Sequence, residues 1–261
     1  MDGWERSGAR HVIILNRRSA SSFFQPLESI GCQGLDGTAV NRTLHNSQVK
    51  HHLQQPFFRS LVLKEKLGIV LFNLGGPDCL EAVEPFLRNL FSDPAIIALP
   101  SFLRQPLARM IARRRSPTAR AIYREIGGRS PIRGETERQA RALEEALTGD
   151  EREVKVQVAM RCWHPMSDEA ANALKGFAPD RIVLLPLYPQ FSTTTSGSSF
   201  KDWDRAACRA GLSVPSIRIC CYPIQKGFIA ALAASVRAAM AMPKPGVAYR
   251  LLFSAHGLPK R

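Results

Sequence analysis

Apolar runs of strand length recur along this sequence and alternate with stretches of helical periodicity. The first run is Gly68–Phe72, and others follow at 154–160, 181–187, 216–221 and 251–253. Runs rich in Val, Ile and Leu are typical of strands buried on both faces of a parallel sheet. The helical stretches between them supply the right-handed crossovers that parallel strands need. The sequence therefore predicts an α/β fold built on a doubly wound parallel sheet.

The pattern within the helical stretches also predicts where individual helices begin and end. The stretch from Pro100 to Arg115 has apolar residues on one face and closes on three arginines. Ser116-Pro117 then has the pattern of an N-cap followed by proline at the first helical position. We therefore expect one helix to end at Arg115 and a second to run from Ser116 to the glycine pair Gly127-Gly128.

The chain divides into three expected parts. Residues 1–66 show no sustained period, and we expect this leader to be largely disordered. Residues 67–243 hold the strand–helix alternation and form the first α/β domain. Pro243-Lys-Pro-Gly246 reads as a stiff hinge. Residues 244–261 would then be the first strand and loop of a second, similar domain that the sequence only begins.

Composition limits the partners. The chain has 36 Lys and Arg against 22 Asp and Glu, a net charge of +14. Such a balance suits nucleic acid, an anionic membrane, or a ligand that bears carboxylates or phosphates. Nucleic acid is not expected, because no basic motif interleaved with aromatic residues is present. The six cysteines form no CxxC pair and no secretory signal precedes them, so we expect reduced thiols in a cytosol-like compartment.

Two loops following expected strands could bind an anion. Leu74-Gly75-Gly76-Pro77 makes a tight turn after the first strand, as nucleotide-binding folds do, but it lacks the glycine spacing of the known phosphate fingerprints. The hydroxyl-rich segment Ser192–Ser199 could cradle phosphate or serve as a wall with helix-capping serines. A phosphate- or nucleotide-binding α/β module is therefore one functional class to keep.

His256 follows the last apolar run, where it would lie at the carboxyl end of a strand. Ligands of open α/β sheets bind at that edge, and an imidazole there can accept a proton or hold a metal. A core histidine satisfied by a backbone carbonyl explains the same local sequence. The basic stretch before Ser116 has two readings too: contact with an amphipathic ligand or membrane, or a solvated helix end.

Four strand-end motifs together resemble the ferrochelatases, enzymes that insert Fe²⁺ into protoporphyrin IX in haem biosynthesis. The resemblance covers residues 67–261 and implies a lyase of Rossmann-type fold. The motifs, in chain order, are Leu74–Pro77, Arg161 with His164-Pro165, Tyr188–Phe191 with the following Ser/Thr loop, and Ser254–Gly257.

The resemblance also implies roles for single residues. His256 matches the active-site histidine at the porphyrin centre, the catalytic and metal-handling position. Leu74 matches the apolar residue packed on the porphyrin face. The remaining substrate-binding positions are those near the propionates and those of the pocket wall: Arg113, Arg114, Arg115, Ser130, Tyr123, Arg161, Ser192 and Thr193.

Two departures from the family pattern shape the expectation. Cys162 stands where the family commonly has tyrosine, and no residue matches the glutamate that faces the histidine across the porphyrin. We therefore expect a truncated ferrochelatase, or alternatively a non-catalytic porphyrin-binding fragment, with protoporphyrin IX and Fe²⁺ as its ligands. The expected location is the bacterial cytoplasm with peripheral membrane contact, or alternatively the mitochondrial matrix. Whether an iron–sulfur cluster is present stays open.

Overall fold

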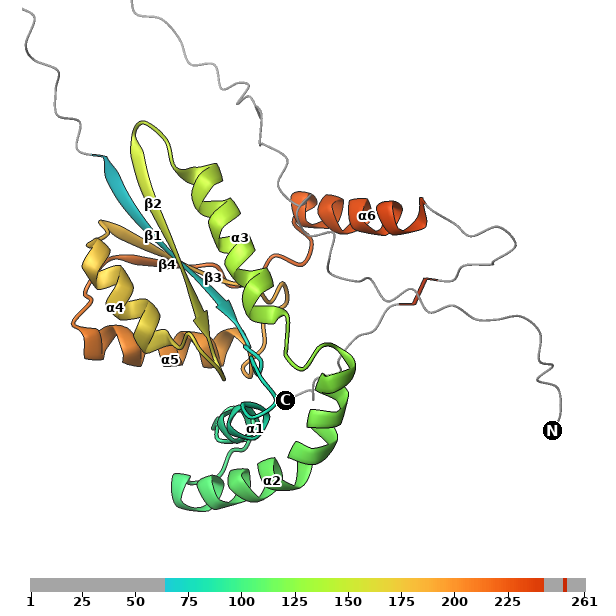
Figure 1. The fold of residues 1–261 in the computed structure, drawn as a ribbon. Coiled ribbons are helices and arrows are strands. Elements are labelled where there is room, and N and C mark those ends of the chain that lie inside the picture. The colour runs from blue at the N-terminus through green and yellow to red at the C-terminus, as the bar shows by residue number, and fades with distance from the viewer. Residues whose placement is uncertain (1–63, 242–250, 253–261) are drawn as a thin grey trace, which may run out of the picture.

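The computed structural model describes residues 64–241 and 251–252 of the chain (Figure 1). Its centre is a four-stranded sheet in the order β2-β1-β3-β4, in which every neighbouring pair is parallel. The strands are β1 (Glu65–Asn73), β2 (Arg152–Met160), β3 (Arg181–Pro186) and β4 (Ser216–Arg218). The predicted α/β class with a parallel sheet is confirmed.

Strand β1 lies in the middle of the sheet and is buried on both faces. Leu71 pairs with Val158 of β2 on one side and with Leu185 of β3 on the other. Six consecutive residues, 67–72, are buried, which explains why the sequence of this strand is a continuous apolar run rather than an alternation.

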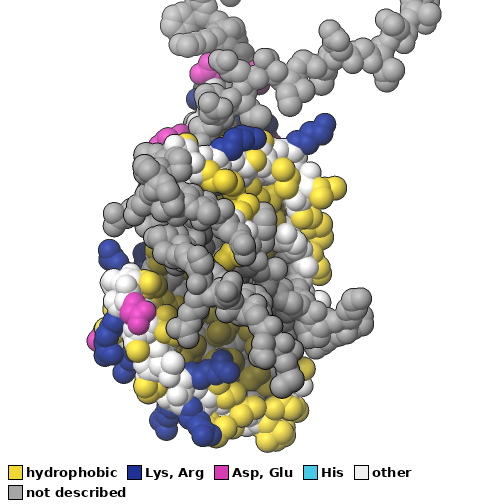
Figure 2. All heavy atoms as spheres, turned by 90° about the vertical axis from the view of Figure 1, so that its right-hand side faces the viewer, with side chains coloured by type: hydrophobic (Ala, Val, Ile, Leu, Met, Phe, Trp, Pro, Cys, Tyr) yellow, Lys and Arg dark blue, Asp and Glu magenta, His cyan; other side chains and the backbone are white. Residues whose placement is uncertain are grey.

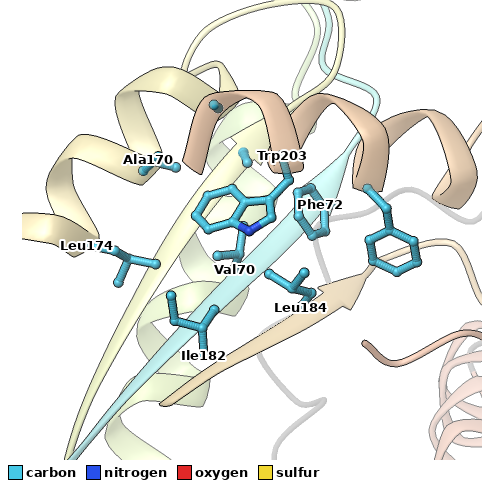
Figure 3. Close-up of a cluster of buried hydrophobic side chains, with 11 residues drawn as sticks. Val70, Phe72, Ala170, Leu174, Ile182, Leu184 and Trp203 are labelled. Atoms are coloured by element: carbon cyan, nitrogen blue, oxygen red, sulfur yellow. The ribbon is translucent and has the colours of Figure 1, made fainter. Parts of the chain in front are cut away.

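Helices cover both faces of the sheet. α3 (Ile132–Leu147) packs on one face against β1 and β2, whereas α4 (Ser167–Phe177) and α5 (Ser196–Ala210) lie on the other (Figure 1). On the α4 and α5 side, Phe72 meets Trp203 edge to face with ring centroids 6.1 Å apart (Figure 3). This two-sided arrangement is the doubly wound architecture expected from the sequence.

Helices α1 (Val83–Phe91) and α2 (Ser101–Glu125) pack on each other and form a lobe beside the carboxyl end of β1 (Figure 1). We call this pair the α1–α2 lobe. The prediction of a helix boundary at Ser116 is wrong, because α2 runs continuously through Pro106 and Pro117 and curves along its length. The side chain of Ser116 is buried instead of capping, and α2 accommodates the prolines at the cost of backbone hydrogen bonds.

Helix α6 (Lys226–Met240) has no buried side chain. The first part of the expected fifth strand, Leu251 and Leu252, is exposed and lies in no strand. The other residues of that expected strand lie outside the part of the chain that the structure describes, so the strand stays a prediction. Among the described residues, no helix is both long enough and apolar enough to cross a membrane.

Candidate functional site at the carboxyl edge of the sheet

The carboxyl ends of β1 and β2 meet at the glycine turn. The backbone amide of Arg161 donates to the carbonyl of Asn73 at 2.8 Å, and the amide of Cys162 donates to the carbonyl of Leu74 at 2.9 Å. The connection after β1 leads to β2, whereas the connection after β3 leads to β4 in the opposite direction, so the winding reverses between β1 and β3, next to this turn. Crevices at such a point are where open α/β sheets bind ligands. Leu74 and Arg161 are thus brought together.

Ser130 lies against the same turn. Its backbone amide donates to the carbonyl of Pro77 at 2.8 Å, and a Cβ atom on Gly76 would lie only 2.5 Å from its hydroxyl oxygen. Gly75 has φ +86°, a left-handed conformation that glycine adopts without strain. The two glycines therefore let the turn pass close to Ser130, and three predicted site residues share this edge.

The side chain of Arg161 takes part in a buried polar network with the α1–α2 lobe and α5. Its Nη2 atom lies 2.9 Å from Oδ2 of Asp93, which is 2% exposed. Its Nε atom donates to the hydroxyl of Ser198 at 2.7 Å, and that hydroxyl in turn donates to Asp93 Oδ2 at 2.5 Å. Charge-assisted hydrogen bonds of this kind hold a guanidinium in one orientation. The three side chains are called the Asp93 network below.

The hydroxyl-rich loop before α5 is largely satisfied internally. Ser192 Oγ lies 2.6 Å from Thr195 Oγ1 and accepts the backbone amide of Thr195 at 3.1 Å. Thr193 is exposed. Ser198, in the first turn of α5, is the residue after this loop that contacts Arg161. The hydrogen bonds of Ser192 stay within the loop, so the structure does not join Ser192 to Arg161.

Two further side chains at this edge are held in their neutral form. Burial raises the pKa of the Cys162 thiol to about 12, and it raises the pKa of the Tyr188 phenol as well. Both groups are therefore protonated at neutral pH. Cys162 is fully buried, so it packs inside the fold and does not offer a thiolate to a ligand.

The three consecutive arginines lie on α2, away from the sheet edge. Successive helical residues project about 100° apart, so these side chains fan out instead of converging. Arg113 lies 3.8 Å from the carboxylate of Glu84, and the guanidinium of Arg115 lies over the Phe91 ring, 5.5 Å from its centroid. Arg114 is exposed.

Tyr123 lies in the last turn of α2 and is partly buried, which raises its pKa. Basic and apolar groups mix at the lower end of the view in Figure 2, and α2 carries exposed apolar side chains. Phe102 is 75% exposed and Ile122 is 57% exposed. The predicted site residues thus form two groups: Leu74, Ser130 and Arg161 at the sheet edge, and the arginines with Tyr123 on the α1–α2 lobe.

Sequence reasoning did not identify Asp93, and it included Ser198 only as a member of the hydroxyl-rich segment Ser192–Ser199. Ser92-Asp93-Pro94 has only the signature of a turn, and Asp93 Oδ1 does accept the amide of Ala95 at 2.8 Å as such a turn requires. Its second role depends on an arginine far along the chain, for which no local signal exists. His256 lies outside the described residues, so its placement stays a prediction.

Other candidate features lie away from the sheet edge. A cavity of about 230 Å³ runs along the outer side of β2, where Glu144, Lys155 and Pro165 are among its lining residues. His164 Nδ1 lies 2.6 Å from Glu169 Oε1, but within the described parts of the chain no three side chains of His, Cys, Asp or Glu are grouped to hold a metal.

The family model for ferrochelatase matches residues 66–261. The chain belongs to the ferrochelatase family. Proteins named ferrochelatase from Phenylobacterium zucineum, Caulobacter vibrioides and Pelagibacter ubique are 53%, 50% and 46% identical to it over 198, 201 and 198 residues. These matches cover 75%, 76% and 75% of this chain but 57% of each relative. The parallel sheet, apart from the first residue of β1, and the glycine turn lie within the residues that the family model matches.

Proposed function

We propose that the protein inserts Fe²⁺ into protoporphyrin IX, and that the sheet edge described above forms part of the porphyrin site. Membership of the ferrochelatase family supports the reaction. The observation that supports the site is the meeting of Leu74, Ser130 and Arg161 at the carboxyl edge of the sheet, where β1 and β2 end beside the β1/β3 crevice.

The proposed ligand explains why apolar and polar groups meet there. A porphyrin presents a large apolar face and two carboxylates, so Leu74 would pack on the ring while a hydroxyl and cations meet the propionates. Ser130 and the arginines 113–115 supply those groups. Because Arg113 and Arg115 have partners on α1, Arg114 is the arginine of this run that is most available to a carboxylate.

Metal insertion also needs proton and metal handling. Two pyrrole N–H protons must leave while Fe²⁺ sheds its water ligands, and a neutral imidazole can assist either step. We assign this role to His256, on its match to the family motif. The other requirement is a bent macrocycle whose nitrogen lone pairs face the incoming ion, and binding contacts at the ring periphery can supply that strain.

A porphyrin titration tests the proposal. The full chain should quench the fluorescence of protoporphyrin IX saturably, and Leu74→Asp should weaken binding by at least about tenfold, because it places a charge against the ring face. Asp204→Asn, an exposed carboxylate on α5, is the matched control and should bind as the wild type does. Absence of saturable binding would overturn the proposed site.

A separate assay distinguishes an enzyme from a non-catalytic porphyrin-binding protein. Fe²⁺-dependent formation of protohaem would show catalysis, and His256→Ala should abolish it while porphyrin still binds. Binding without turnover would favour the non-catalytic alternative. We further propose the division into 1–66, 67–243 and 244–261. Because β1 begins at Glu65, the test of the leader is a variant lacking residues 1–63, which should bind porphyrin as the full chain does.

The phosphate-binding alternative has less support. The hydroxyl of Ser192 is hydrogen-bonded to Thr195, and the guanidinium of Arg161 is paired with Asp93. Both groups would have to give up these partners in order to bind an anion. Calorimetry with inorganic phosphate should therefore show no binding in the millimolar range. Tight phosphate binding that Ser192→Ala removes would favour this alternative.

Peripheral membrane contact is a second proposal, carried by α2. The helix has seven arginines and one acid, and Phe102 and Met110 expose apolar surface on it. The protein should sediment with vesicles that contain anionic lipid and should bind little to vesicles of zwitterionic lipid. The double change Phe102→Ser with Arg114→Gln should reduce the fraction of protein that sediments with the anionic vesicles. On this basis we place the protein at the cytoplasmic side of a bacterial membrane.

A further inference from the structure

The α1–α2 lobe is joined to the sheet through few contacts. Its two helices bury apolar residues mainly against each other, and the described strands and helices make hardly any direct packing with them. Asn89 on α1 donates to the carbonyl of Cys162 at 3.1 Å. Arg120 on α2 donates to the carbonyl of Leu80, in the loop after β1, at 3.1 Å. The Asp93 network, in the segment that joins α1 to α2, is the connection that involves charged side chains from both parts.

Asp93 is bonded on both carboxylate oxygens. Oδ1 accepts the amide of Ala95 within its own turn. Oδ2 pairs with Arg161, the residue after β2, and accepts the hydroxyl of Ser198 from α5. Its backbone carbonyl also accepts the amides of Ile96 and Ile97, which shape the path into α2. One buried residue therefore shapes the turn between α1 and α2, and its carboxylate also ties that turn to the end of β2 and to α5.

We propose that Asp93 is a positioning residue that sets the α1–α2 lobe relative to the sheet edge and thereby fits the site to a porphyrin dicarboxylate. This inference rests on the proposed function. The two groups of site residues stand on opposite sides of the network: Leu74 and Ser130 on the sheet side, Arg114 and Tyr123 on the lobe. A rigid ligand that touches both groups binds well only if the lobe is held at one distance.

The Asp93 network can hold the lobe in place because losing its ion pair or its hydrogen bond would leave buried polar groups without partners. Removing the charge of Asp93 leaves the guanidinium of Arg161, 13% exposed, without its counter-ion. Ser198 then loses its acceptor as well. The guanidinium would turn toward water, and the lobe would lose its charged connection to the end of β2 and to α5.

Two ligands separate positioning from a general loss of stability. Protoporphyrin IX carries both carboxylates, whereas its dimethyl ester has the same ring without their charge. In the full chain, Asp93→Asn should weaken binding of protoporphyrin IX by at least about tenfold and binding of the ester by much less, because the apolar contact at Leu74 stays on the sheet. Asp204→Asn, which removes one partner of an exposed pair with Arg218, is the matched control and should change neither affinity.

A double-mutant cycle tests the geometry directly. If the network holds Arg114 in reach of the propionate, Arg114→Ala should cost less affinity in the Asp93→Asn background than in the wild type. Ser198→Ala keeps the ion pair and should give an intermediate loss, so the inference can be tested even if Asp93→Asn fails to fold. Additive effects of the Asp93 and Arg114 changes would overturn the inference.

The outcomes also separate this inference from the proposed function. If wild-type protein binds neither porphyrin, the proposed function fails and the inference fails with it. If the wild type binds both but Asp93→Asn and Ser198→Ala lose acid and ester affinity in equal proportion, only the positioning role of Asp93 is overturned.

Discussion

The position that a Cβ atom would take on Gly76 lies 2.5 Å from Oγ and 2.6 Å from Cβ of Ser130. The two residues belong to different loops, one after β1 and one before α3, and they pass each other with no room for a methyl group. The amide of Ser130 bonds the carbonyl of Pro77 at 2.8 Å, so the contact is fixed on both sides. Placement of the Ser130 hydroxyl therefore depends on glycine at position 76.

Gly76→Ala should lower the free energy of unfolding by about 1–3 kcal/mol, because the added methyl forces two loop backbones apart. Urea unfolding measures the loss. The matched control is Gly134→Ala in α3, where no atom lies within 4 Å of the added carbon. That change should raise stability by up to about 1 kcal/mol through helix propensity. Equal effects at the two positions would contradict the close approach of Gly76 to Ser130.

The thiol of Cys162 should resist alkylation in the native protein. It is fully buried and its pKa is raised to about 12, so at pH 8 it offers almost no thiolate, whereas Cys79 and Cys208 are exposed. Iodoacetamide trapping followed by peptide mass spectrometry should label the two exposed thiols well before Cys162. Labelling of all three at one rate would show that Cys162 is accessible.

The same thiol should make stability fall with pH above about 9. Its pKa rises from an ordinary 9.0 to about 12 on folding, so the folded state binds the proton more tightly and loses its advantage as the unfolded thiol ionises. The decline contributed by this group is at most about 1.4 kcal/mol per pH unit between these values. Unfolding between pH 8.5 and 10.5 should therefore show a shallower decline for Cys162→Ala than for the wild type. Cys208→Ala, at an exposed position, should keep the wild-type slope.

Ala178→Gly should raise the free energy of unfolding by about 0.5–1 kcal/mol. Ala178 ends α4 at φ +53°, a left-handed conformation in which a side chain is unfavourable and glycine is not. α5 ends in the same way at Gly211 with φ +66°, and there Gly211→Ala should destabilise by a similar amount. Opposite signs in thermal unfolding are the expected result, and equal signs would contradict the assigned backbone conformations.

Glu144→Ala should destabilise the fold by about 1–2 kcal/mol and promote aggregation. The carboxylate of Glu144 accepts the backbone amide of Val156 at 2.7 Å and the amine of Lys155 at 3.0 Å, so α3 supplies an acceptor to a strand at the end of the sheet order. Light scattering after mild heating measures the aggregation. Glu145→Ala, at an exposed neighbouring position, is the control and should behave as the wild type.

Local patterns predicted those elements whose sequence reflects their burial. β1 and β3 were predicted because strands packed on both faces are apolar throughout, and the end of α2 was predicted from Gly127 and Gly128, which both have positive φ. The helix boundary at Ser116-Pro117 was predicted wrongly, because the same two residues also fit inside a long helix. There the packing of α2 on α1 compensates for the backbone hydrogen bond that proline cannot donate.

The candidate site was predicted in part. Leu74 and Arg161 were placed at one edge because the carboxyl ends of parallel strands must meet there. The Asp93 network could not be predicted, because it joins three segments distant in sequence. The arginine run was read as one cationic patch, yet Glu84 and Phe91 each take one of its members, which only the packing of α1 on α2 reveals.

The central position of β1 sets an order in which this domain can assemble. β1 leaves the ribosome first among the described strands, but its partners β2 and β3 begin only at Arg152 and Arg181. Until both have been synthesised, its apolar residues have no ladder to join, whereas α1 and α2 can pair as soon as they emerge. A nascent chain of this protein therefore leaves its central apolar strand without a complete ladder until Pro186, the last residue of β3, has been synthesised.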